Sequence, residues 1–231
     1  DANLVAVQYY ITRLVKKFRE KQRNLYPLIL THLNPYYFKN FTFHNQKVYF
    51  LKKSIPTINN DFRKLITARK EPSIALQIAR HYLHYDPAPI DLEHQFKALG
   101  LREAWGNSTA FQEYTAAEWI KYVNESERYD PFAVCCFVRV QIEKKVHDAI
   151  ADSARKLQFI DTTKTTSKLD FAASIGVDVD DTLYLLGIIY NDGMHIHDNV
   201  DDNSPIVSKL ENRTIRNMLL ESVKDIDLQQ M

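Results

Sequence analysis

The residue types best suited to metal or acid–base chemistry gather in one short segment late in the sequence. It reads His195-x-His197-Asp198-x-x-Asp201-Asp202. Imidazole nitrogens and carboxylate oxygens are ligands for zinc, manganese and magnesium. The segment is short and polar, however, and its composition is equally typical of a solvated connection between helices. No matching distant ligand is obvious, so we favour the solvated connection and assign no metal ligand, with a metal site as the alternative.

Two further pairs lie at helical spacing. His81 and His84 are three residues apart in ARHYLHYDP, which suits either a metal pair or the packed end of a helix. Arg139 and Glu143, in FAVCCFVRVQIEKKVHDAI, are four apart and therefore share one face of a helix. Such a pair could act on a substrate. It is also among the commonest helix-stabilising pairs, contributing about 0.2–0.5 kcal/mol.

Another candidate is a histidine at the end of an apolar run. The apolar residues 28–30 stop at Thr31 and His32, so residues 26–32 predict a buried strand that ends in this histidine. The string KVYFLKK, residues 47–53, predicts a second strand. A helical turn is expected between them, and this alternation is typical of an α/β layer.

Helices are predicted for most of the chain. Asp1 is a good N-cap, and apolar residues at helical spacing predict an amphipathic helix over 2–20. Its far end is basic, which is typical of a solvated helix C-terminus or, alternatively, of phosphate contact. Past residue 56 no strand is predicted. The predicted helices there cover 58–68, 73–85, 90–99, 109–124, 132–150, 164–175, 179–192 and 205–223.

Composition bounds the function classes. The 231 residues are 45% hydrophobic and 26% charged, which is typical of one large or two small globular domains. A net charge of +1 gives no global field toward nucleic acid or membrane. Cys135 and Cys136 are adjacent and rarely bridge, so we expect reduced thiols in the cytoplasm. No apolar run reaches the roughly 18–20 residues of a membrane span.

The residues around His32 resemble the C-terminal part of an ABC-type ATPase head of the SMC-like and RecF-like kind. In such heads a D-loop ending in aspartate precedes a helix, and the next strand ends in Thr-His. The resemblance implies that Asp1 lies in the D-loop at a dimer interface. It also implies that His32 senses the γ-phosphate or orients the attacking water. The resemblance includes PrrC and RloC anticodon nucleases and their relatives in bacterial antiviral systems, such as the ATPases of Septu and of some retrons.

The nucleotide site that this resemblance implies is incomplete here. A P-loop needs two glycines five residues apart, followed by Lys and Ser or Thr. The five glycines do not form it: Gly100, Gly106, Gly176, Gly187 and Gly193. The chain begins at Asp1 without an initiator methionine. We therefore expect a preceding part that holds most of the ATP and Mg²⁺, and a homodimer that completes the site.

The PrrC and RloC resemblance continues into the helical region. Their nuclease domain carries Arg-x3-Glu on one helix and a histidine on a later one, and the matching residues here are Arg139, Glu143 and His195. The resemblance implies metal-independent cleavage of RNA, with tRNA as the substrate. Arg139 would stabilise the phosphate charge and His195 would act as base or acid. The acids around His195 oppose RNA binding.

We therefore predict the α/β tail of an ABC ATPase head over 1–56, followed by a mainly α-helical domain over 57–231. The expected function is the ATPase subunit of a bacterial antiviral, toxin-like system in which ATP hydrolysis controls a nuclease. Two alternatives concern the helical domain: it is itself a tRNA endoribonuclease, or it docks a partner nuclease through an exposed apolar patch. A stand-alone helical protein is a further possibility.

Overall fold

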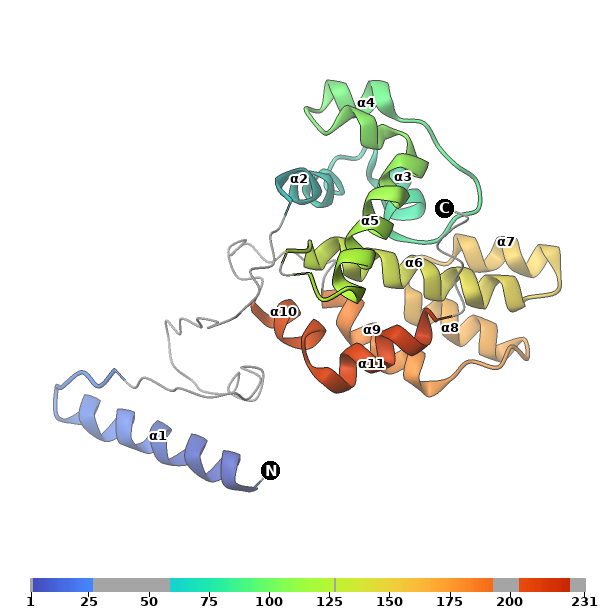
Figure 1. Cartoon of the computed structure of the whole chain (residues 1–231). Coiled ribbons are helices and arrows are strands. Elements are labelled where there is room, and N and C mark those ends of the chain that lie inside the picture. The colour runs from blue at the N-terminus through green and yellow to red at the C-terminus, as the bar shows by residue number, and fades with distance from the viewer. Residues whose placement is uncertain (1, 27–58, 127, 193–203, 225–231) are drawn as a thin grey trace. The chain divides into compact units, whose positions relative to one another are not determined.

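The described part of the chain is helical (Figure 1). The computed structural model describes residues 2–26, 59–126, 128–192 and 204–224. Within these ranges the structure has helices, one isolated β-bridge between Asp91 and Asn107, and no strand. The mainly helical prediction is confirmed for them. The strands predicted over 26–32 and 47–53 fall outside them, except for Tyr26, which is 85% exposed. The α/β tail therefore stays a prediction.

Contacts divide the chain into two compact units, Asp1–Leu51 and Lys52–Met231. The described helix of the first unit is α1, Ala2–Glu20, which matches the range predicted from apolar spacing. Val15 is buried, whereas the basic residues near the helix end are exposed. The chain leaves α1 through Gln22, which has a positive φ of 56°.

The second unit is built around one long helix, α6. The first described helix of the unit is α2, Asn60–Ala68. Helix α6 packs against α5 on one side and against α8, α9 and α10 on the other (Figure 1). The remaining bounds are α3 Ala75–Ile78, the π-helix η2 Ala79–Leu83, α4 Glu93–Ala98, the 3₁₀-helix η3 Glu103–Gly106, α5 Ser108–Val123, α6 Pro131–Ala149, α7 Ser153–Asp161, α8 Thr165–Ser174, α9 Asp181–Asp192, α10 Ser204–Leu210 and α11 Arg213–Ser222.

Helix α6 is central because it is apolar on nearly every side. Each of its residues from Pro131 to Glu143 is buried. A helix that is hydrophobic all round must be covered all round. Phe137 stacks on Trp119 of α5 with ring centroids 5.5 Å apart, and Phe132 stacks on Phe62 of α2 at 6.3 Å. Aromatic rings of α2, α5 and α6 therefore form part of the core of this unit.

Two helix predictions were wrong in detail. The sequence pattern missed α7, where Phe159 and Ile160 are buried but Leu157 is 62% exposed, so the apolar periodicity is weak. The single helix predicted over 205–223 is two helices. The first, α10, ends at Leu210, and Asn212 caps α11, because its side chain accepts hydrogen bonds from the backbone N–H groups of Thr214 and Ile215.

Asp130 fixes the start of α6. Its carboxylate accepts from the backbone N–H groups of Phe132 at 2.9 Å and Ala133 at 3.3 Å, which is the N-cap arrangement. It also accepts from the Asn59 N–H and the Tyr114 hydroxyl, both at 3.0 Å. Burial raises the pKa of Asp130 to about 6, and these four donors oppose the rise. One side chain therefore joins the starts of α2 and α6 and the middle of α5.

Replacing this cap should be costly. We expect Asp130→Ala to lower the free energy of unfolding by at least about 2 kcal/mol, since it removes an N-cap and leaves buried donors without an acceptor. Asp152→Ala is the matched control, because Asp152 caps α7 from an exposed position with a single bond to the Arg155 N–H. It should cost about 1 kcal/mol. Equal losses in urea titrations of the two variants would contradict the role given to Asp130.

Candidate functional site

The one predicted site residue with a complete set of described contacts is Glu143, in the middle of α6. Its carboxylate is fully buried, with 0% exposure. Oε1 accepts from the Thr165 hydroxyl at 2.6 Å and lies 2.7 Å from Nδ1 of His84. Oε2 accepts from the Tyr85 backbone N–H and from the Lys168 ammonium, both at 3.0 Å.

These four donors fill the acceptor capacity of the carboxylate. An ionised carboxylate has about four lone-pair directions, two on each oxygen. The donors come from two places in the chain: His84 and Tyr85 directly follow η2, while Thr165 and Lys168 lie on the first turn of α8. Glu143 therefore ties α6 to both neighbours at a single point, which we call the Glu143 junction.

The partners determine the charge state of Glu143. Burial by itself would raise its pKa, but His84, Lys168 and the Thr165 hydrogen bond outweigh that effect and hold the pKa at about 2. Lys168 is itself only 1% exposed, so the pair is a buried ion pair. Lys168 also lies over the ring of Phe159, 5.1 Å from its centroid, which keeps the ammonium in place.

His84 acts as a neutral donor in this junction. Burial lowers its pKa, and the positive charges of Arg139 and Lys168 lower it further, while Glu143 opposes them. A carboxylate can only accept, so the His84 proton at Nδ1 faces Glu143. At neutral pH the imidazole thus contributes a hydrogen bond and Lys168 supplies the balancing charge. In acid the protonated imidazole adds the charge that holds the pKa of Glu143 low.

Arg139 lies one turn before Glu143 and is also buried, with 5% exposure. Its positive charge acts on its neighbours in α6 and beyond. Burial raises the pKa of the Cys136 thiol to about 12, and the charge of Arg139 opposes this rise. The thiol donates to the Tyr82 carbonyl at 3.2 Å. Cys136 is therefore a protonated core thiol, and Cys135 beside it is buried and forms no disulfide.

The other predicted site residues lie in parts of the chain that the structure leaves undescribed. Asp1 and His32, predicted for the nucleotide site, are among them. So is the segment with His195, His197 and the acids that follow. The convergence of Arg139, Glu143 and His195 stays a prediction. The structure brings Glu143 together with His84, a partner that the spacing on α6 could not reveal.

His81 and His84 have separate partners. Nδ1 of His81 lies 3.1 Å from the Ala88 carbonyl, whereas Nδ1 of His84 faces Glu143. Among the described residues, no group of three or more His, Cys, Asp or Glu side chains could hold a metal ion. The pair therefore has the contacts of a packed helix end, which was one of its two interpretations.

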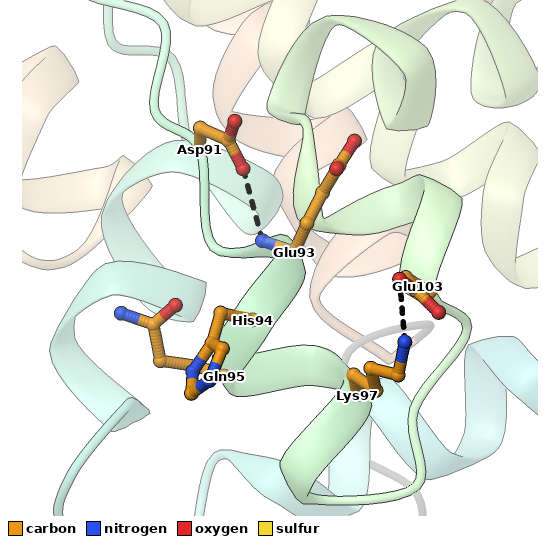
Figure 2. A pocket seen from close by; sticks show the side chains of 6 residues that line it. All are labelled: Asp91, Glu93, His94, Gln95, Lys97 and Glu103. Carbon is orange, nitrogen blue, oxygen red and sulfur yellow. Dashed lines mark hydrogen bonds and ion pairs between the residues drawn. The ribbon is translucent and has the colours of Figure 1, made fainter.

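The surface near α4 carries a shallow, open depression of about 550 Å³ (Figure 2). Its lining residues contact neighbours that are close in the sequence. The Asp91 carboxylate accepts from the Glu93 N–H at 2.9 Å, and Lys97 pairs with Glu103 at 3.4 Å. Its remaining lining residues are His94 and Gln95. Neither Glu143 nor any of its four partners lines this depression.

Comparisons with protein-family models, curated proteins and solved structures find no match to this chain. No described helix is long and apolar enough to cross a membrane.

Acid should weaken the Glu143 junction. A folded-state pKa near 2, against an ordinary 4.5, means that the carboxylate adds stability that is complete above about pH 5. This contribution, about 3 kcal/mol, is lost as the pH falls toward 2. We expect Glu143→Gln to be destabilised at about pH 7 and to approach the wild type at about pH 3.

Thermal melts at the two pH values would measure this gap. Glu113→Gln is the control, since Glu113 lies on the exposed face of α5. It should match the wild type at both. A gap between Glu143→Gln and the wild type that did not change with pH would argue against an ionised Glu143.

The stability of the protein should also depend on Lys168. Replacing it by methionine leaves Glu143 as a buried charge without its cation, and breaking a buried pair typically costs about 3–5 kcal/mol. We expect the free energy of unfolding of Lys168→Met, measured by chemical denaturation, to fall by most of this amount. Lys144→Met, at an exposed position of α6, should change stability by less than about 0.5 kcal/mol. If both variants were equally stable, the ion pair would have no structural role.

Proposed function

We propose that this chain is the C-terminal part of an ABC-type ATPase of a bacterial antiviral system, and that its helical unit is a platform for a partner nuclease. ATP and Mg²⁺ would be held mainly by a preceding part and by a second head in a homodimer. The observation that carries the role of the helical unit is the closed Glu143 junction. It favours the docking alternative over a ribonuclease built into this unit.

A general base must reach the proton that it removes. Glu143 has no exposed surface, and four protein donors already occupy its oxygens. Arg139, with 5% exposure, is no more accessible to a phosphate. A pKa of about 2 would also make Glu143 a weak base at neutral pH. These properties fit a residue that holds helices together, and they do not favour one that reacts with RNA.

The ATPase part of the proposal is supported by the sequence around His32 and by the helix before it. In the ABC heads that the chain resembles, a helix separates the D-loop aspartate from the strand that ends in the switch histidine. Helix α1 begins at Ala2, directly after Asp1, and ends at Glu20, before the predicted strand. Its length of 19 residues and its position agree with that arrangement.

The first test is ATP hydrolysis by the complete protein, purified with the products of neighbouring genes. We expect His32→Ala to reduce the hydrolysis rate by about 100-fold, as removal of one preorganised group at a reacting phosphate does. The control is His94→Ala, because His94 is an exposed histidine of α4. It should hydrolyse ATP like the wild type. Unchanged hydrolysis in His32→Ala would overturn the ATPase assignment.

The second test separates docking from built-in ribonuclease activity. Total tRNA is incubated with the complete protein alone and with its partner, for the wild type and for Arg139→Ala. The proposal expects cleavage only when the partner is present. Cleavage by the protein alone that disappears in Arg139→Ala, with the melting curve unchanged, would replace docking by the endoribonuclease alternative.

A further inference from the structure

One face of α1 combines exposed tyrosines with exposed cations. Tyr9 is 63% exposed and Tyr10 is 66% exposed. Arg13, Lys16 and Lys17 follow them and are exposed as well. Large aromatic side chains are usually at least partly covered in folded proteins. Two adjacent exposed tyrosines beside three cations therefore need an explanation.

This face lies opposite the apolar stripe of the helix. At 3.6 residues per turn, Ile11, Val15 and Phe18 fall on one side of α1. Val15 is buried, and the other two are partly buried. Tyr9 and Lys16 project from the opposite side, about half a turn away. A segment that covers only the apolar stripe therefore leaves Tyr9 and Lys16 accessible.

Charge is strongly concentrated here. Residues 13–23 contain six cations and one acid, a net charge of six minus one, or +5. The complete chain carries only +1, so the remainder is net acidic. Glu20 is the acid on the same face, one turn beyond Lys16. A local field of this size attracts a polyanion even though the chain as a whole is nearly neutral.

The aromatic and cationic groups already lie together. The Arg13 guanidinium lies over the Tyr9 ring, 5.7 Å from its centroid. A flat ring with a cation beside it presents a stacking surface next to a phosphate contact. Proteins that bind single-stranded nucleic acid combine these two features, because every base has a face that can stack.

We propose that the face formed by Tyr9, Tyr10, Arg13, Lys16 and Lys17 binds a single-stranded nucleic acid. The three cations contact consecutive phosphates, and a base stacks on Tyr9. A duplex fits less well, since its bases are already stacked on one another. This inference does not depend on the proposed ATPase function, and it is tested without nucleotide.

The test is fluorescence anisotropy of labelled single strands of about 20 nucleotides, in DNA and RNA forms, with the complete chain. We expect Tyr9→Ala to weaken binding by roughly 5- to 100-fold, whereas Tyr9→Phe, which keeps the ring, binds like the wild type. Replacing Arg13, Lys16 and Lys17 together by glutamine should reduce the slope of log affinity against log salt by about 2. Comparison of the DNA and RNA strands identifies which polymer is preferred.

A control triple variant removes the same charge elsewhere. Lys70, Lys144 and Lys164 are exposed on the second unit, and replacing them by glutamine should leave affinity unchanged. Equal losses in the two triple variants would overturn the site. So would tight binding to duplex alone, an unchanged affinity in Tyr9→Ala, or competition by polyglutamate as effective as that by the unlabelled strand.

Discussion

The buried ion pair between Glu143 and Lys168 is the constraint on which the second unit depends. A carboxylate without exposure is tolerated only when its charge is balanced and its oxygens accept hydrogen bonds. Here the balance comes from α8, and one further donor comes from each of His84, Tyr85 and Thr165. These bonds fix the position of α6 relative to α8 and to the residues after η2. Hydrogen bonds are directional, so they define this position more sharply than apolar contacts would.

The same helix carries the apolar core. Aromatic rings from α2 and α5 cover its first half, and the Glu143 junction follows in its second half. Asp130 supplies the polar anchor at its start. Helix α6 is thus fixed by a polar group at its N-terminus, by packing along its length and by an ion pair further on. This construction suits a rigid platform, since movement of α6 would expose a charge or break a cap.

The two units differ in where the described residues of functional interest lie: buried in the second unit and exposed in the first. The second unit places its candidate catalytic residues, Arg139 and Glu143, inside the core. The first unit places tyrosines and cations of α1 on the outside. A large substrate can contact only exposed side chains. The exposed tyrosines and cations of α1 are therefore available for recognition, whereas the motif residues Arg139 and Glu143 are not. Burial in the core and the four hydrogen bonds of Glu143 thus explain the Arg139–Glu143 motif at least as fully as a catalytic role would.

The sequence alone predicted most of the described helices, because apolar spacing and N-caps are local signals, although it missed α7 and merged α10 with α11. It predicted α1 to the residue. It also found Arg139 and Glu143 as a notable pair through their spacing. What the pair does was decided by tertiary structure. Lys168 and Thr165 lie more than twenty residues beyond Glu143, and His84 lies 59 residues before it. No local spacing encodes a contact that exists only once separate helices pack.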